Sequence, residues 1–322
     1  MARAPQPDFL VVGAPKAGTT ALHAALAQHP QVFTTTPKEP KFWLCDDAPP
    51  PHWCGPGDRH SQQEWIWRRA DYAALFRDAA PGQVRGESTP FYLWSRSAHR
   101  RIAAELPSVR LIALVRDPVD RAYSNWMHLW SDGLEPVADF EEAFALQDER
   151  VERGYAPFWR YRDLGLYGEQ LAHLRTLVDP ARLLVIRYRD VVDDPGGTVD
   201  RACRFLGLET GLVPVIPRDN ARPFVTPGWR SRLLGPTVRA SAALAQFAPP
   251  EWWRRASRPL TGLLAGGGQP FRPHLTPEQR ARLLPAFADD IELLAEVTGE
   301  DFDDWLSTDS RGSYLQREQR TG

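Results

Sequence analysis

The sequence predicts an α/β protein with a central parallel sheet flanked by helices. Two observations predict this class. Short, predominantly apolar runs occur at residues 9–12, 109–115 and 182–188, and such runs are typical of strands buried on both faces of a parallel sheet. Segments with helix-forming composition and capping residues lie between these runs, which favours strands joined by helices.

Length and composition narrow the class of protein. The chain has 322 residues and a formal net charge of −2, so it can bury a sizeable core but lacks the basic surface that general nucleic-acid binding needs. Residues 1–8 are too few for a signal peptide, and no later run approaches the apolar length of a membrane span. We therefore expect a cytoplasmic protein.

The three cysteines do not suggest a metal site. Cys45, Cys54 and Cys203 lack metal-ligand spacing, and in a reducing compartment they predict free thiols, although a Cys45–Cys54 bridge stays open. No Cys/His cluster indicates a metal elsewhere, so we expect chemistry without a metal.

The first apolar run leads into a glycine-bounded loop and then a helix expected from Thr19 to Leu26. Gly13 and Gly18 let the backbone bend so that its amides approach an anion, and the helix dipole adds positive charge at the same place. We expect the hydroxyls of Thr19 and Thr20 to cap the helix. The alternative is an ordinary strand-to-helix turn that happens to contain glycines.

The loop is P-loop-like but differs from a nucleoside-triphosphate P-loop at one position. In the pattern G-x-x-x-x-G-K-[ST] a lysine follows the second glycine, whereas Thr19 stands there in this sequence and the lysine has moved to Lys16. This difference weakens a kinase hypothesis. The segment resembles instead the 5′-phosphosulfate loop of sulfotransferases that use 3′-phosphoadenosine 5′-phosphosulfate (PAPS), which carries a P-K-x-G-T-T pattern. The resemblance implies that PAPS is bound by Pro15, Lys16, Ala17, Gly18, Thr19 and Thr20.

Lysine is scarce in this chain. Of the 39 basic residues only three are lysines, Lys16, Lys38 and Lys41, which leaves 39 − 3 = 36 arginines. A flexible ammonium is not interchangeable with a planar guanidinium. We therefore interpret the three lysines as chemically required, the alternative being chance clustering.

A second segment follows a short strand expected over residues 32–35. Glu39 lies between Lys38 and Lys41, and two nearby ammonium groups favour an ionised carboxylate that can accept a proton. The segment resembles sulfotransferases of the heparan-sulfate type and their bacterial relatives, in which a glutamate followed by an aromatic pair acts as general base. The resemblance implies this role for Glu39, with Phe42 and Trp43 behind it; a surface salt bridge is the alternative.

A second acidic candidate ends another expected strand. Glu87 lies in the run 83–90, where a strand meets a polar turn, and the carboxyl ends of strands are where α/β sheets place ligands. The PAPS-dependent family commonly carries a G-E-x-[ST]-P turn here. Glu87 is therefore the second candidate for the base, and the alternative is a buried carboxylate satisfied by backbone donors.

A third segment follows the most apolar run. The PAPS sulfotransferases have an R-[DN]-P turn followed by R-x-x-S on the next helix, and residues 116–124 are similar to that pattern. The resemblance implies that Arg116 and Ser124 meet on the 3′-phosphate of the nucleotide. For Arg121 we expect an ion pair with Asp117 or Asp120.

The three segments together predict a single sulfotransferase domain over residues 1–306, with a helical insertion or lid at 231–272 and a polar tail at 307–322. A basic segment at 220–222 or 228–230 is a candidate to close the nucleotide site. The last helix is expected to begin at Thr276 with Pro277 in its first turn, and its apolar stripe extends to Val297.

These features predict in-line transfer of a sulfuryl group from PAPS to an acceptor hydroxyl on a small metabolite or carbohydrate. In this hypothesis Glu39 removes the acceptor proton and Lys16 stabilises the departing phosphate. Two alternatives stay open, namely a P-loop nucleotide kinase and a non-catalytic protein that binds PAPS or its product, 3′-phosphoadenosine 5′-phosphate (PAP). A homo-oligomer is possible.

Overall fold

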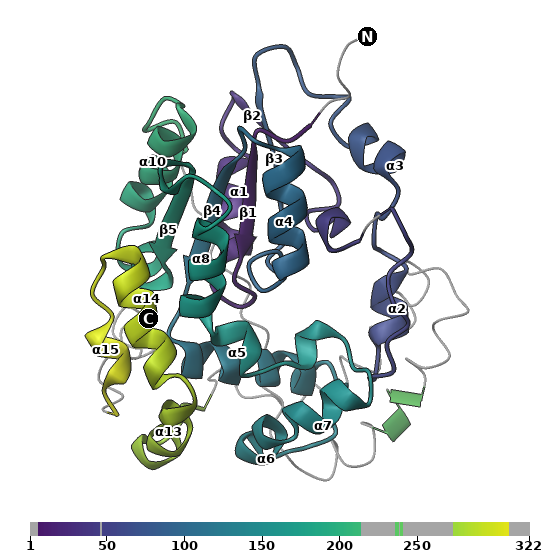
Figure 1. Ribbon diagram of the computed structural model, residues 1–322, viewed down its shortest axis with the longest axis vertical. Helices are drawn as coiled ribbons and strands as arrows, with labels where there is room; N and C mark the ends of the chain where they lie inside the picture. The colour runs from purple at the N-terminus through teal and green to yellow at the C-terminus, as the bar shows by residue number, and fades with distance from the viewer. Residues whose placement is uncertain (1–5, 46, 214–235, 238, 241–272, 309–322) are drawn as a thin grey trace.

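The computed structural model describes residues 6–45, 47–213, 236–237, 239–240 and 273–308. Five parallel strands form one sheet in the order β2-β3-β1-β4-β5 (Figure 1). The strands are β1 (Phe9–Gly13), β2 (Val32–Thr34), β3 (Val84–Ser88), β4 (Arg110–Val115) and β5 (Leu183–Arg187). The predicted α/β class with a central parallel sheet is therefore confirmed.

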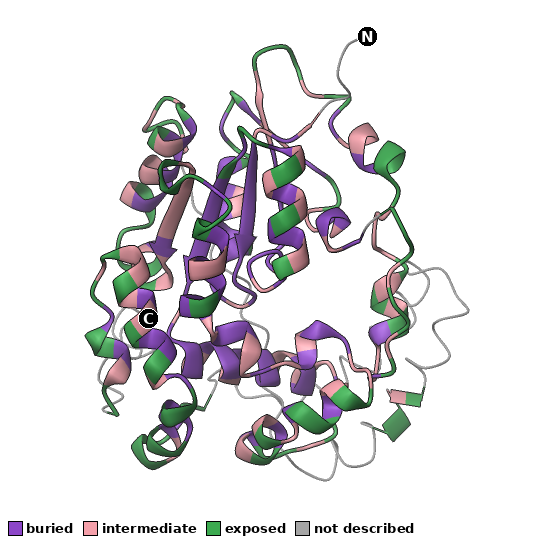
Figure 2. Cartoon of the chain, in the orientation of Figure 1, coloured by how far each residue is buried: buried purple, intermediate pink, exposed green. Residues whose placement is uncertain are grey.

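The middle of the sheet forms the core. All five residues of β1 are buried, and so are five of the six residues of β4 (Figure 2). These strands pair along their length, with Leu10 opposite Leu111 and Val11 opposite Ile112. Their unbroken apolar runs are explained by this position, since a central parallel strand faces packed helices on both sides.

Helices cover both faces of the sheet. Helices α4 (Arg96–Glu105) and α8 (Tyr167–Arg175) contact each other in front of the sheet in Figure 1, and α14 (Ala288–Thr298) packs on α8. Helix α1 (Thr19–Leu26) lies behind the strands and contacts α10 (Pro195–Leu206). The helix α5 (Pro118–Ser131) follows β4 below the sheet.

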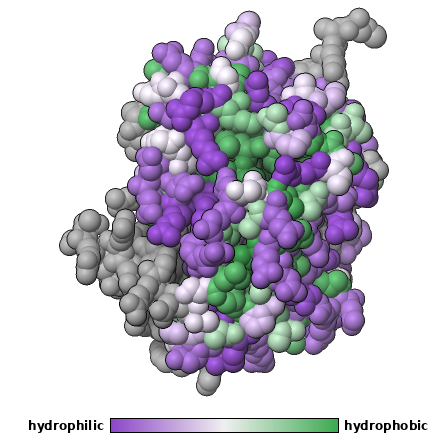
Figure 3. Space-filling view, turned by 60° about the vertical axis from the view of Figure 1, so that its left-hand side comes forward, coloured by the Kyte–Doolittle hydropathy of each residue, from purple (hydrophilic) through white to green (hydrophobic). Residues whose placement is uncertain are grey.

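The remaining described helices are short. They are α2 (Asp58–Gln62), α3 (Arg69–Ala74), α6 (Phe140–Ala145), α7 (Gln147–Glu152), α9 (Tyr188–Asp193), α13 (Pro277–Leu283) and α15 (Asp303–Leu306). Five short 3₁₀ turns also occur in the described chain, η1 (Phe42–Leu44), η2 (Pro157–Trp159), η3 (Asp163–Gly165), η4 (Pro180–Arg182) and η6 (Leu284–Ala286). On one face of the molecule, hydrophobic residues gather in a central band between hydrophilic ones (Figure 3).

One predicted helix is interrupted. The prediction of a single helix from Thr276 to Val297 is wrong. Helix α13 ends at Leu283, and a 3₁₀ turn containing Pro285 separates it from α14. Proline lacks the N–H that continues a helix, so the ladder breaks there. The predicted N-terminus is confirmed, since Thr276 caps α13 in a capping box with Gln279.

Several predicted features lie outside the described residues. These are the insertion or lid at 231–272, apart from four residues, the closing-segment candidates at 220–222 and 228–230, and most of the tail at 307–322. Cys45, Cys54 and Cys203 are free thiols, so the Cys45–Cys54 bridge is not formed. Within the described ranges, no helix has the length and hydropathy needed to cross a membrane, and no group of three metal-ligating side chains occurs.

Candidate active site

The site is built where four parallel strands end at the same edge of the sheet. The segments that follow β1, β2 and β4 carry Lys16, Glu39 and Arg116, and β3 carries Glu87 at its own carboxyl end. Parallel strands bring such ends together, and α/β proteins bind ligands there. The three predicted segments therefore meet in space although they are far apart in the sequence.

The loop after β1 follows a tight path. Gly18 has a φ of 90°, and a Cβ there would lie 2.9 Å from Cδ2 of Tyr188. At Gly13 a Cβ would lie 2.4 Å from Cβ of Leu93. Both glycines are therefore required by close packing, and Gly18 also by its left-handed backbone. The loop is fixed to the neighbouring strand by the Ala14 amide, which donates to the Leu114 carbonyl at 2.6 Å.

The start of α1 differs in one respect from expectation. Gly18 is the N-cap and no side chain caps the helix, so the expected capping by Thr19 and Thr20 is wrong. Their hydroxyls instead accept hydrogen bonds from Nζ of Lys38, at 3.4 and 3.0 Å. The first-turn amides of a helix have no partner inside it, so an uncapped start suits an anion.

Glu39 lies between two lysines, as its sequence position predicts. Its carboxylate is 3.2 Å from Nζ of Lys38 and 4.0 Å from Nζ of Lys41, and its side chain is 31% exposed. Lys38 contacts Glu39 and both threonine hydroxyls of the loop at once. The Glu39 segment and the glycine loop are therefore joined through one ammonium group.

Lys16 has a left-handed backbone, with a φ of 69°, and contacts two further elements. Its Nζ lies 3.5 Å from Nδ1 of His128 on α5, and Nε2 of that histidine lies 3.5 Å from the carboxylate of Asp132. The Lys16 carbonyl accepts a hydrogen bond from Nη1 of Arg116 at 3.3 Å. The geometry thus brings Lys16 and Arg116 together.

Arg116 offers a donor to an anion. Its guanidinium lies over the Tyr188 ring, 4.8 Å from the centroid, and its buried Nε has no hydrogen-bond partner among the described residues. A buried polar atom without a partner is costly unless a ligand satisfies it, so the residues fit an anionic nucleotide. Ser124 lies buried on α5, and no hydrogen bond within the described chain joins it to Arg116.

The predicted ion pair of Arg121 with Asp117 or Asp120 is not formed, so this prediction is wrong. Arg121 is buried and donates to Oδ1 of Asn125 at 3.0 Å and to the Tyr161 carbonyl. Burial lowers the pKa of its guanidinium to about 10. It therefore anchors the segment before α8 rather than pairing with an aspartate.

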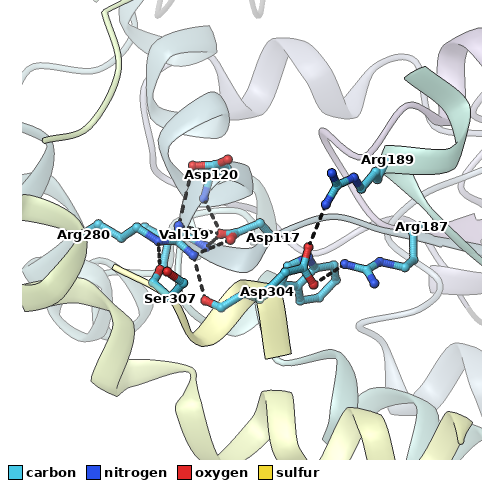
Figure 4. A network of polar contacts seen from close by, with 9 residues as sticks. Asp117, Val119, Asp120, Arg187, Arg189, Arg280, Asp304 and Ser307 are labelled. Atoms are coloured by element: carbon cyan, nitrogen blue, oxygen red, sulfur yellow. Dashed lines mark hydrogen bonds and ion pairs between the residues drawn. The ribbon is translucent and has the colours of Figure 1, made fainter. Parts of the chain in front are cut away.

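The aspartate after Arg116 pairs with an arginine that the sequence did not single out. Asp117 caps α5 by accepting from the amides of Val119 and Asp120, and its carboxylate also accepts from Arg280 on α13 (Figure 4). Asp120 lies 3.8 Å from the same guanidinium. Nothing in the local sequence indicates a contact that spans 163 residues.

Asp304 on α15 extends this network on the side of β5. Its carboxylate pairs with Arg187 and Arg189, which lie at the end of β5 and in α9, while Arg280 also donates to backbone carbonyls near the end of the described chain (Figure 4). The network therefore ties the C-terminal helices to the turn that presents Arg116.

Glu87 is buried beneath the Glu39 segment, with no exposed surface. Its partners are side-chain hydroxyls, including that of Thr89 at 2.9 Å and that of Tyr72 at 3.3 Å, rather than the backbone donors of the alternative interpretation. Burial raises the pKa of Glu87 to about 8, against the effect of these hydrogen bonds.

The sequence interpretation missed His23. Its Nδ1 lies 2.8 Å from Oγ of Ser88, so it connects α1 to the end of β3. Burial, followed by the charge of Lys38, lowers the pKa of His23 to about 4, and Glu39 acts in the opposite direction. The ring is therefore neutral near pH 7. A lone histidine in a helix gives no sequence signal for such a contact.

An uncapped helix start beside Lys16, Lys38 and Arg116, with the Glu39 carboxylate next to Lys38, suits an enzyme that binds an anionic nucleotide and transfers a group from it. A family model described as "Sulfotransferase family" matches residues 7–211, and the chain belongs to that family. The predicted family, that of PAPS-dependent sulfotransferases, is thereby confirmed.

Individual relatives agree with this membership. Human heparan sulfate glucosamine 3-O-sulfotransferase 6 is 32% identical over 206 residues, which are 63% of this chain and 53% of the relative. Human bifunctional heparan sulfate N-deacetylase/N-sulfotransferase 3 is 27% identical over 209 residues, 63% of this chain and 22% of the relative. The chain thus spans about half the length, or less, of these curated relatives.

Among solved structures, the sulfotransferase from Alicyclobacillus acidocaldarius is similar over nearly the whole chain. The TM-score is 0.72 at 27% sequence identity, and the match covers 93% of this chain and 98% of that structure. The predicted P-loop-like sulfotransferase fold is confirmed by this likeness.

Proposed function

We propose that the protein transfers the sulfuryl group of PAPS to a hydroxyl of a small metabolite or carbohydrate, with Glu39 as general base. One observation carries the proposal: Lys38 Nζ lies 3.2 Å from the Glu39 carboxylate and 3.0 Å from the Thr20 hydroxyl. A proton acceptor therefore lies beside the loop that suits an anion, as transfer between two oxygens in line requires.

The roles of the other residues follow from their positions. The backbone and hydroxyls of Pro15, Ala17, Gly18, Thr19 and Thr20 hold the 5′-phosphate side of the nucleotide. Lys16 stabilises the negative charge that appears on the phosphate oxygen as its bond to sulfur breaks. Arg116 and Ser124 hold the 3′-phosphate, and the unpaired Nε of Arg116 supports this role.

The exposure of the two glutamate side chains favours Glu39 over Glu87 as the base. A general base must come within hydrogen-bond reach of the proton that it removes. The Glu39 side chain is 31% exposed, whereas Glu87 is 0% exposed and already surrounded by hydroxyls. We therefore propose that Glu39 accepts the proton of the acceptor hydroxyl as the new O–S bond forms.

The acceptor class rests on the relatives. Those whose names contain glucosamine 3-O-sulfotransferase act, by name, on a sugar of heparan sulfate, which supports a carbohydrate hydroxyl as one candidate. A small metabolite is the other. The aromatic side chains of Phe91 and Phe158 pack edge to face near His128, which supports an acceptor with a flat or apolar part.

The test is a transfer assay with ³⁵S-labelled PAPS. The acceptors are 4-nitrophenol, N-acetylglucosamine, a desulfated heparan oligosaccharide and an extract of the producing cell, with chelator added to every assay that contains PAPS. A separate assay without chelator contains ATP and Mg²⁺. We expect label on an organic product and an equal amount of PAP. Tight PAP binding without transfer to any acceptor would favour the non-catalytic alternative, and phosphate transfer from ATP with Mg²⁺ would favour a kinase.

We also propose residence in the cytoplasm, no binding to nucleic acid, and possible self-association. The net charge of −2 supports the second of these. Cell fractionation, gel-shift titration and light scattering test the three properties separately.

A further inference from the structure

The Glu87 side chain lies at the centre of a buried cluster of hydroxyls. Thr89 donates to its Oε2 at 2.9 Å, Tyr72 donates to its Oε1 at 3.3 Å, and the hydroxyl of Tyr92 makes a third hydrogen bond to the carboxyl group. Their exposed fractions are 0% for Glu87, Thr89 and Tyr92, and 4% for Tyr72. Water therefore does not compete for these contacts.

Each hydroxyl of the cluster also accepts a hydrogen bond from the segment 38–44, which carries Glu39 and is called the base segment below. The three bonds run from Lys41 N to Thr89 Oγ1 at 3.2 Å, from Trp43 N to Tyr92 Oη at 3.4 Å, and from Trp43 Nε1 to Tyr72 Oη at 3.0 Å. A hydroxyl has one hydrogen. When that hydrogen points to Glu87, its lone pairs face the base segment.

We propose that Glu87 is a positioning residue that fixes the base segment, and with it the Glu39 carboxylate, through these three hydroxyls. The inference rests on the proposed role of Glu39 as base. In this role the buried Glu87 carboxyl group affects the reaction although it does not contact the acceptor.

The base segment is held on both sides of Glu39. On one side the Ser88 amide donates to the Lys38 carbonyl at 3.1 Å, and on the other the Thr89 hydroxyl accepts from Lys41. Residues 87–89 thus face the residues that flank the base. Since a displacement of about 1 Å at a reacting group can reduce a rate about 100-fold, this anchoring is able to control turnover.

The protonation states suit the arrangement. Burial raises the pKa of both Tyr72 and Tyr92, so these hydroxyls keep the hydrogen that they direct to Glu87. Phe42 adds a stacked contact with the Tyr72 ring at 4.4 Å, which fixes the orientation of that ring. The cluster is therefore closely packed as well as inaccessible to water.

The test uses two variants that interrupt the cluster in different ways. Near pH 7 the Glu87 carboxyl group holds a proton, because burial raises its pKa to about 8, yet both of its oxygens still accept hydrogen bonds. In Glu87→Gln an amide NH₂, which only donates, replaces one of these oxygens, so one hydroxyl loses the group to which it donates. Thr89→Val keeps the shape but removes the hydroxyl that accepts from Lys41. Asp290→Asn is the matched control, because Asp290 is a buried carboxylate with a pKa raised to about 6 by burial, and it accepts from Gly168 and Glu169 instead.

The first readout is amide hydrogen exchange in peptides covering residues 38–44, which needs no acceptor. Loss of one buried hydrogen bond is worth about 1 kcal/mol, so we expect roughly fivefold faster exchange at Lys41 and Trp43 in both variants. Asp290→Asn should leave it unchanged. Unchanged exchange in both Glu87→Gln and Thr89→Val would overturn the inference.

The second readout is the transfer rate with the acceptor found active in the screen, or PAPS hydrolysis where only water reacts. We expect about a tenfold or larger loss of kcat in both variants, with PAP affinity retained, when Glu39→Gln is inactive. If both variants transfer at the wild-type rate while Glu39→Gln is inactive, the positioning role of Glu87 is overturned and the proposed function is left intact. Full activity in Glu39→Gln would instead refute Glu39 as base.

Discussion

At the scale of single residues, the proposed chemistry depends on where three ammonium groups lie. The sequence indicates a special role for Lys16 because this residue stands away from the usual P-loop position, and for Lys38 and Lys41 because lysine is rare in the chain. The structure brings Lys38 to both the glycine loop and Glu39, which the sequence spacing alone did not predict. The displaced Lys16 contacts Arg116 and His128.

Replacement of Lys16 by alanine tests its role. We expect transfer to fall about 10²- to 10³-fold, because the charge on the leaving phosphate loses a preorganised cation, while PAP binding weakens much less. Initial rates at saturating PAPS, together with calorimetric titration of PAP, provide the measurement. A variant with the wild-type rate would contradict the assignment of the loop.

The raised pKa of Glu87 predicts that the stability of the folded protein depends on pH. Its pKa is raised from 4.5 in the unfolded chain to about 8 in the folded protein, so the folded state holds this proton more tightly. The stabilisation is present in full below about pH 4.5 and is lost as the pH rises through 8. The Tm of the wild type should therefore fall between pH 5 and 8 by more than that of Glu87→Gln, as followed by circular dichroism. Parallel curves for the two proteins would contradict this expectation.

The sequence predicted residues better than it predicted their partners. Gly18, Glu39 and Arg116 lie at the site edge because motif spacing fixes their place after a strand. The true partners of Arg121 and Asp117 were not predictable, since Tyr161 and Arg280 reach them through tertiary packing. Local sequence carries no information on such distant contacts.

At the scale of elements, α13 supports the turn that presents Arg116. Arg280 and Asp117 form a buried pair, with side chains 8% and 10% exposed, and Asp117 caps α5. The short helix therefore stabilises the start of α5 from a distant part of the chain.

Two arginines on α13 provide a matched pair of variants. Arg280→Ala should lower the free energy of unfolding by about 3–5 kcal/mol, because it leaves the Asp117 carboxylate buried without its cation. Arg282→Ala removes an ion pair with Glu141 in which the arginine is 58% exposed, and it should cost about 1 kcal/mol or less. Urea denaturation distinguishes them; equal losses would argue against α13 as a support.

Elements were predictable to the extent that a local signal specified them. The strands β1, β4 and β5 follow from apolar runs, and α13 begins where Thr276 and Pro277 predict it. The expected burial of the last of these strands is wrong, because β5 lies at the edge of the sheet and only Ile186 in it is buried. The break at Pro285 was missed because the apolar stripe continues on both sides of it. Periodicity alone therefore did not identify the interruption.

At the scale of the whole molecule, the strand order explains why the site exists. The order β2-β3-β1-β4-β5 places the ends of four neighbouring strands beside one another, so that the Glu39, Glu87, Lys16 and Arg116 segments share one edge. The sequence predicted a parallel sheet but not this order, because strand pairing depends on contacts between residues far apart in the chain.

This arrangement predicts that Arg116 contributes to the binding of nucleotides with a 3′-phosphate much more than to the binding of nucleotides without one. Arg116→Ala should weaken PAP by roughly 10- to 100-fold, because a hydrogen bond to a charged group contributes about 1.5–3 kcal/mol. It should affect adenosine 5′-phosphate, which lacks the 3′-phosphate, much less. Titration of both nucleotides gives the comparison, and equal losses would contradict the role of Arg116.

Glu39→Gln tests whether Glu39 is the base of a PAPS-dependent transfer. The measurement is the rate of ³⁵S transfer from labelled PAPS to the active acceptor, with PAP affinity measured on the same preparations. We expect a loss of about 10²- to 10⁴-fold in kcat with PAP affinity nearly unchanged. Transfer at the wild-type rate in Glu39→Gln would contradict it.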